Sequence, residues 1–148
     1  MQLTNISRDV LEDAELGRRY IPGEWCDDLS APKIVELAKN GTTEDRLKVS
    51  TAIKRTLLLA ETYYVSGFKG LTYLPPRNHL AILIAGIIYR LIGRRLLKTG
   101  TEWWVGRQVV NSTGKLLHSL YPPLLMLNRF KRFPLHESHL HKCLKDYI

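Results

Sequence analysis

The fold of this chain is decided near its start, by the stretch QLTNISRDVLEDAELG at residues 2–17. No proline or glycine interrupts this stretch before Gly17, and a glycine commonly follows the last residue of a helix. We therefore predict one uninterrupted helix that ends at Gly17.

Four polar side chains of that predicted helix fall in one line, here called the polar row: Gln2, Asn5, Asp9 and Asp13. At 100° per residue they span about 80° of the helical wheel and border an apolar sector. Carboxylates one turn apart repel each other, and a divalent cation with oxygen ligands removes that cost. From spacing alone, a solvated acidic face explains the pattern equally well, because Asp-x-x-x-Asp is common by chance.

Length and composition indicate one ordered globular domain, with 148 residues, 45% apolar and 24% charged. The net charge of +8 is uneven, since residues 69–148 hold 13 Lys or Arg against 3 Asp or Glu, a net of +10. This half would suit a diphosphate, a membrane surface or nucleic acid. Nucleic acid ranks last, because the sequence has no motif of a nucleic-acid-binding fold.

The cysteines and histidines predict neither a disulfide scaffold nor a metal site. With only Cys26 and Cys143 and no signal peptide, the chain fits the cytoplasm, with peripheral membrane association as an option. The spacing of the remaining candidates fits no standard zinc site: His136, His139, His141 and Cys143.

Further helices follow from local signals. We predict a short helix from Ser30 as N-cap to Lys39, and a long one capped by Thr43 that reaches about Ser66. The apolar run 80–88 predicts a buried central helix, because it is far shorter than the roughly 20 residues that cross a bilayer. We expect two more helices, from about Thr101 and from Ser112 or Thr113.

Several motifs resemble one family. The stretch 2–13, followed by GRRYIP at residues 17–22, resembles the second aspartate-rich motif of the squalene/phytoene synthases, most closely the bacterial phytoene synthases. Three later motifs fit the same family in the same order: residues 61–75, IYRLIG at residues 88–93, and Trp104-x-x-Arg107.

The resemblance implies an all-α fold, the C-terminal half of the isoprenoid (class I terpene) synthase fold. The chain would then be a single partial domain over residues 1–148, with a variable tail from about residue 124. The implied function is head-to-head condensation of two geranylgeranyl diphosphates to phytoene, through a cyclopropyl diphosphate, in carotenoid biosynthesis. One alternative is squalene or dehydrosqualene formation from farnesyl diphosphate, and another is a non-catalytic basic module that binds nucleic acid or a membrane.

The polar row and the resemblance together give a candidate site, with Mg²⁺ as cofactor and Mn²⁺ as an alternative ion. The expected metal ligands are Asn5, Asp9 and Asp13. The expected catalytic residues are Asp9, Asp13 and Tyr89. The expected substrate-binding residues are Gln2, Asn5, Arg8, Arg18, Tyr89 and Arg107. The run 80–88 would line the hydrocarbon tunnel, and ordinary core packing is equally compatible with it.

Each diphosphate contact has a plainer explanation beside it. Arg18 could pair with Asp13 or Glu15 on the surface, Tyr89 could be a structural tyrosine, and Arg107 could stack on a nearby tryptophan. The family carries two aspartate-rich motifs, whereas Asp9 and Asp13 form the only Asp-x-x-x-Asp pair in this sequence. We therefore expect an incomplete fragment, inactive alone, with Met1 an internal methionine or a misplaced start.

Overall fold

The computed structural model describes residues 1–99, 101–106 and 137–140, and this part of the chain is helical without a strand. The elements, with η for a 3₁₀ helix, are α1 (Gln2–Arg8), α2 (Val10–Glu15), η1 (Gly23–Trp25), α3 (Ala31–Asn40), α4 (Thr43–Gly70), η2 (Leu71–Tyr73), α5 (Pro76–Lys98) and η3 (Trp103–Val105). The all-α prediction is confirmed.

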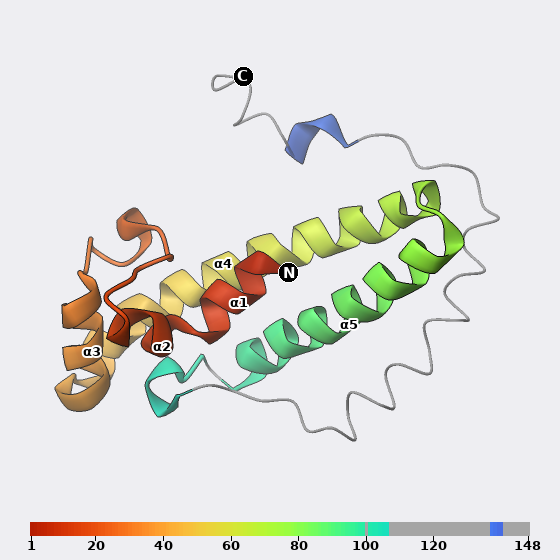
Figure 1. The fold of residues 1–148 in the computed structure, drawn as a ribbon. Helices are drawn as coiled ribbons and strands as arrows, with labels where there is room; N and C mark the ends of the chain where they lie inside the picture. The colour runs from red at the N-terminus through yellow and green to blue at the C-terminus, as the bar shows by residue number, and fades with distance from the viewer. Residues whose placement is uncertain (100, 107–136, 141–148) are drawn as a thin grey trace.

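The two long helices, α4 and α5, form a hairpin that turns at η2, and α1 packs against both of them (Figure 1). At the other end of the hairpin, α2 packs on α3, beside the first turns of α4. The core gathers where these elements meet, around Ile34 of α3 and Val49 and Ile53 of α4, each at most 1% exposed. The start of the chain is therefore held by buried neighbours.

The first predicted helix is divided. The interruption falls at Asp9, whose backbone has φ −100° and ψ 18°, so the prediction of one continuous helix was wrong. The backbone hydrogen bonds continue across the break. The Asp9 N–H donates to the backbone carbonyl of Asn5 (2.9 Å), and the Asp13 N–H donates to the backbone carbonyl of Asp9 (2.8 Å). The side chain of Arg8 grips Asp9, and a regular helix does not bring neighbouring side chains face to face. This local contact accounts for the bend.

The caps of α3 and α4 follow their sequence signals, with one shift. Ser30 is the N-cap of α3 as predicted, whereas the N-cap of α4 is Thr42 instead of Thr43. Thr42 and Asp45 form a reciprocal capping box, in which each side chain bonds the other residue's backbone N–H. Helix α4 also runs past Ser66 to Gly70, because Phe68 still packs on α5 at Gly86.

The prediction that residues 80–88 form a buried helix was wrong in its burial. They lie inside α5, but only Leu83 and Gly86 of this run are buried, and Ile82 is 41% exposed. One face of α5 packs on α4 and α1, and the described residues cover little of its remaining surface. An apolar run in the sequence does not show whether another helix covers it, so its burial could not be predicted from composition.

After α5, the described part of the predicted helix from Thr101 contains one 3₁₀ turn, η3. Thr101 has φ 57°, and only the three residues of η3 are helical before Gly106, which has φ 95°. Residues 107–136, with Arg107 and the predicted helix from Ser112 or Thr113, lie outside the described residues. No helix in the described part of the chain is long and apolar enough to cross a bilayer.

Candidate metal and diphosphate site

Asp9 marks the centre of the candidate site, at the bend between α1 and α2. Arg8 binds its carboxylate through two hydrogen bonds, from Nε to Oδ1 (2.7 Å) and from Nη2 to Oδ2 (2.6 Å). Both side chains are largely shielded, with 11% of Arg8 and 18% of Asp9 exposed. The hydrogen bond to Asp9 is the main reason that the pKa of Arg8 is raised. A forked pair of this kind fixes the carboxylate firmly.

Asp13 lies one turn further along, on α2, and is only partly exposed. Burial raises the pKa of its carboxyl, and the negative charges of Asp9 and Glu12 raise it further. Arg18 acts in the opposite direction. The two acids of the polar row are therefore close enough to repel, and this repulsion is the cost that a bound cation would relieve.

Arg18 returns to Asp13 because the chain reverses direction after α2. Gly17 has φ +75°. Its N–H donates to the backbone carbonyl of Ala14, and the N–H of Arg18 donates to the backbone carbonyl of Asp13, both at 2.9 Å. These two bonds form a Schellman cap, in which glycine supplies the left-handed residue. Ile21, only 3% exposed, anchors the returning segment in the core.

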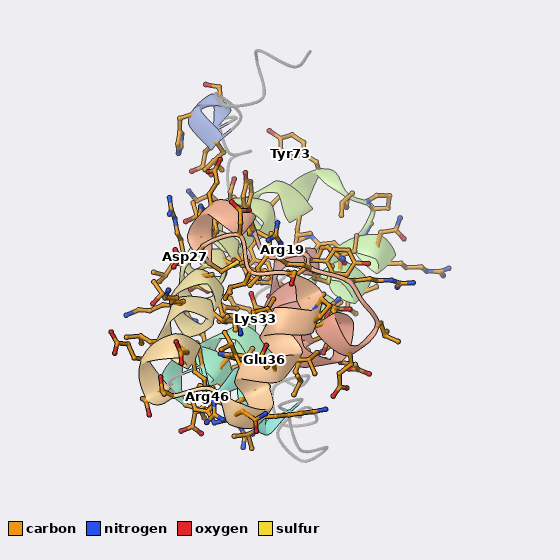
Figure 2. The ribbon with its side chains drawn as sticks, turned by 90° about the vertical axis from the view of Figure 1, so that its left-hand side faces the viewer. Arg19, Asp27, Lys33, Glu36, Arg46 and Tyr73 are labelled. Atoms are coloured by element: carbon orange, nitrogen blue, oxygen red, sulfur yellow. The ribbon has the colours of Figure 1, made fainter. Side chains whose placement is uncertain are left out.

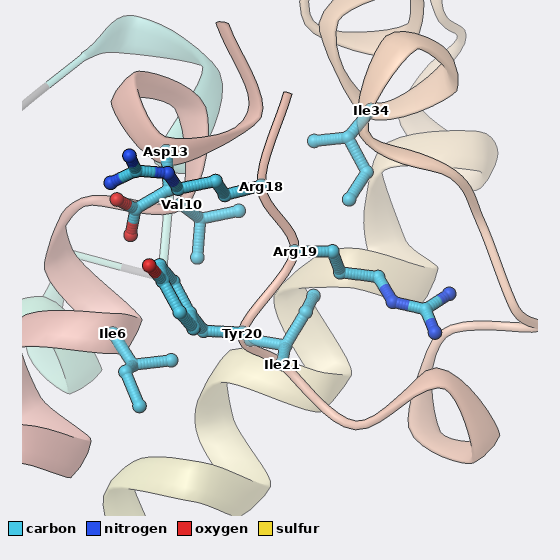
Figure 3. Close-up of a pocket in the computed structure, with 8 residues that line it drawn as sticks. All are labelled: Ile6, Val10, Asp13, Arg18, Arg19, Tyr20, Ile21 and Ile34. Carbon is cyan, nitrogen blue, oxygen red and sulfur yellow. The ribbon is translucent and has the colours of Figure 1, made fainter. Parts of the chain in front are cut away.

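The reversal builds a small pocket beside the acids, shown in Figure 3 and lined by Ile6, Val10, Asp13, Arg18, Arg19, Tyr20, Ile21 and Ile34. The Arg18 guanidinium lies next to the Asp13 carboxylate, whereas Arg19 points the other way. Arg19 donates to the Leu29 carbonyl (2.9 Å) and so ties down the following loop. Of the two sequence-adjacent arginines, only Arg18 faces the site.

The amides of the polar row differ in their surroundings. Gln2 is exposed, while the Oδ1 atom of Asn5 is buried and has no hydrogen-bond partner. A buried amide oxygen without a partner is costly, and a cation beside Asp9 would satisfy it. Among the described residues, no group of three or more His, Cys, Asp or Glu is gathered as a metal site. The Mg²⁺ site stays a prediction, and such an ion could use one or two carboxylates with water and phosphate oxygens in its other positions.

Tyr89 reaches the same region from α5. It is partly buried and lies near enough to Arg8 to contribute to the raised pKa of that guanidinium. Burial is the main cause that raises the pKa of Tyr64, and Tyr89 raises it further. The Tyr64 hydroxyl is hydrogen-bonded to Thr4 Oγ1 at 2.8 Å. The structure therefore places Tyr89 near Arg8, and its expected role in the site stays a prediction.

Two supporting contacts were missed by sequence reasoning. The buried Thr4–Tyr64 hydrogen bond joins α1 to α4 next to Asn5, and Glu61 of α4 binds both Arg90 and Arg94 of α5. Tyr64, Glu61 and Arg90 all belong to the quoted motifs, so the signal was present, but their pairing depends on how the helices meet. Through α4, these contacts hold α1, which carries Asn5, and α5, which carries Tyr89.

The remaining candidates do not join the site in the described residues. Arg107 lies outside them. Among the described residues, Arg46 contacts Trp104, and its guanidinium carbon lies 5.1 Å from the ring centroid. His139 is exposed, while His136, His141 and Cys143 also lie outside the described residues. Cys26 is buried as a free thiol.

Comparison with known proteins matches residues 1–115 to the squalene/phytoene synthase family model. The chain is 38% identical over 122 residues to the 15-cis-phytoene synthase of Enterobacter agglomerans, covering 78% of this chain and 38% of that protein. It is 41% identical over 115 residues to that of Paracoccus sp. (strain N81106 / MBIC 01143), covering 78% and 36%. It is 34% identical over 140 residues to the 15-cis-phytoene synthase of Pantoea ananas, and this match covers 94% of this chain and 44% of that protein.

The chain spans about two fifths of the length of these curated relatives. No solved structure matches it. The family model nevertheless covers most of the chain, including the polar row, the returning Arg18 segment and all of α5. The chain belongs to the squalene/phytoene synthase family.

Proposed function

We propose that this chain supplies the metal and diphosphate half of a head-to-head prenyltransferase of the phytoene synthase type. The substrate would be geranylgeranyl diphosphate, and two molecules would condense to phytoene through a cyclopropyl diphosphate. The names of the relatives, 15-cis-phytoene synthase, support phytoene over the squalene alternative.

One observation carries this proposal: each of the two partly buried acids has an arginine beside it, Arg8 on Asp9 and Arg18 next to Asp13, and the amide oxygen of Asn5 on the same row has no hydrogen-bond partner. Acids alone would suit a bare cation, and arginines alone would suit an anion. Their alternation suits a cation and a diphosphate bound together. Bound Mg²⁺ would stabilise the diphosphate as it leaves.

The residues of the chain have distinct roles in this proposal. Asn5, Asp9 and Asp13 would hold Mg²⁺, with Mn²⁺ as a substitute, and Gln2 would bind at the open end of the row. Arg8, Arg18 and Tyr89 would bind diphosphate oxygens, with Arg107 as a further contact. The apolar side of α5 would face the hydrocarbon chains and exclude water from the carbocation.

Peripheral binding to an anionic membrane is also part of the proposal, because residues 69–148 carry a net charge of +10 and the product is a hydrocarbon. Sedimentation with phosphatidylserine vesicles at low and high salt tests it. Binding that is equal on neutral vesicles would contradict an electrostatic contact.

The metal site is tested by a calorimetric titration of the chain with Mg²⁺ in the presence of inorganic pyrophosphate. We expect Asp9→Asn and Asp13→Asn to weaken Mg²⁺ binding at least about tenfold, since each removes a charged oxygen ligand. Glu15→Gln is the matched control, because Glu15 is an exposed acid on the same helix and should bind as the wild type does.

Unchanged Mg²⁺ binding in both aspartate variants would contradict the proposal and favour a solvated acidic face. Weakening in Glu15→Gln of the same size would show a general effect of charge instead of a site.

A further inference from the structure

Asp9 is already bound by a cation of the chain itself. Both of its carboxylate oxygens accept from Arg8, at 2.7 and 2.6 Å. Arg8 is the residue directly before it, and the two side chains are 11% and 18% exposed. The pair is therefore a short, forked and partly desolvated contact, unlike an open surface ion pair.

The other candidate ligands lack such a counter-charge at hydrogen-bonding distance. Asn5 Oδ1 has no hydrogen-bond partner, and Arg18 lies next to Asp13 without a fork like the one between Arg8 and Asp9. Arg8 thus neutralises one member of a row whose other members remain ready for a cation. A metal ion that binds Asp9 therefore meets the positive charge of Arg8 on the same carboxylate, and the two cations compete for it.

We propose that Arg8 is a latch on Asp9, which it releases when a diphosphate is present to accept its guanidinium. The inference rests on the proposed function, because it takes Asp9 as a metal ligand. A guanidinium fork matches the oxygens of a carboxylate and of a phosphate equally well. Releasing Asp9 without a diphosphate would leave a shielded positive charge unpaired, and that cost weakens the binding of metal alone.

The latch makes metal and diphosphate binding cooperative. Each ligand removes part of the cost that the other meets, so each should tighten the other by the same factor. Mg²⁺ would then bind weakly until substrate arrives. Arg8 acts here as a positioning residue for Asp9 and as a contact for the diphosphate.

The test measures Mg²⁺ binding by calorimetry on the full chain, with and without inorganic pyrophosphate, after protein-free titrations have given their affinity for each other in solution. In the wild type we expect pyrophosphate to tighten Mg²⁺ binding at least about fivefold. Arg8→Lys keeps the charge and loses the forked contact, so Mg²⁺ alone should bind about three- to tenfold more tightly. The factor by which pyrophosphate tightens Mg²⁺ binding should then fall towards one. Arg8→Gln should change both quantities in the same directions.

The controls separate the latch from simpler effects. Arg19→Lys changes an arginine that binds the Leu29 carbonyl away from the row, so its Mg²⁺ affinity should equal that of the wild type. Thermal melting shows which variants are folded, and Arg8→Lys decides the matter if Arg8→Gln does not fold. A tighter Arg8→Gln with an unchanged Arg8→Lys would show long-range charge alone and overturn the latch.

Failure of the latch and failure of the site give different results. If Asp9→Asn loses Mg²⁺ while neither Arg8 variant gains affinity, the latch is wrong and the metal site stands. If Asp9→Asn binds Mg²⁺ as the wild type does, Asp9 is not a ligand and both proposals are wrong.

Discussion

Glu61 is a single residue on α4 that ties the two long helices together. Arg90 Nε lies 3.0 and 2.9 Å from its two carboxylate oxygens, and Arg94 Nη2 lies 2.5 Å from Oε1. The hydrogen bond from Arg90 is the largest reason that the pKa of Glu61 is lowered from 4.5 to about 2. Tyr89 precedes Arg90, so this clamp also fixes the position of Tyr89 relative to α4.

The low pKa of Glu61 predicts how the stability of the chain depends on pH. Its folded pKa lies below its unfolded value, so the contribution is complete above about pH 4.5 and is lost as the pH falls towards 2. Glu61→Gln should lower the free energy of unfolding at pH 7 by about 1–2 kcal/mol, after allowance for solvent screening. It should also make the loss of stability between pH 5 and pH 3 shallower, as measured by urea unfolding at each pH.

Glu36→Gln is the control, because Glu36 pairs with Lys33 on the exposed side of α3 (Figure 2) and such pairs contribute little. It should follow the wild type at each pH. If Glu61→Gln also follows the wild type, the clamp contributes nothing to the docking of α5.

Among the elements, α5 depends on a close approach at Gly93. A Cβ atom there would lie 3.3 Å from Leu57 Cδ2 on α4 and 3.6 Å from Thr4 Cγ2 on α1. The absence of a side chain lets α5 pack on both helices at once, next to the Thr4–Tyr64 bond that supports the site.

Substitutions of two helical glycines should therefore have opposite effects. Gly93→Val adds methyl groups between packed helices and should destabilise the chain by about 1–3 kcal/mol. At Gly67 of α4 a Cβ meets nothing within 4 Å, so Gly67→Ala should stabilise it by about 0.5–1 kcal/mol through helix propensity. Urea unfolding at pH 7 measures both, and a neutral Gly93→Val would show that α5 does not depend on this contact.

Local sequence signals predicted where helices begin and end, but they did not predict which residues are buried or which side chains meet. The cap at Ser30 and the glycine after α2 were found because a side chain or a backbone torsion near in sequence decides them. The bend at Asp9 was missed because it depends on one side-chain contact with Arg8. The apolar run in α5 was expected to be buried, since sequence gives no information on which neighbours lie beside it.

The site was predictable to the extent that one segment carries it. The polar row and Arg18 are near in sequence, and the structure places both acids and Arg18 together. Their roles as metal and diphosphate ligands stay predictions. The Glu61 clamp, by contrast, joins residues 29 positions apart, and its pairing could not be read without the helix packing.

For the whole molecule, the described surface leaves large apolar side chains in water. On the two long helices Leu58, Val65 and Ile82 are 53%, 43% and 41% exposed. The proposed reaction would need a cavity that is closed to water, whereas the described residues leave part of the apolar run 80–88 of α5 exposed. The sequence also has a single Asp-x-x-x-Asp pair, where the family resemblance implies two aspartate-rich motifs.

We therefore expect the isolated chain to bind its ligands without turning them over. Incubated with Mg²⁺ and geranylgeranyl diphosphate, with and without NADPH, it should release no phytoene or other hydrocarbon detectable by chromatography, while calorimetry still shows binding of Mg²⁺ with pyrophosphate. The physical reason is that one acidic pair can hold part of a metal–diphosphate complex, but it cannot by itself assemble a dry cavity and a second set of ligands. A curated relative of full length, assayed in parallel, shows that the substrate and conditions are competent. Robust product from the monomeric chain would show that half of the expected metal site is sufficient, and the role given to the polar row would then have to include both diphosphates.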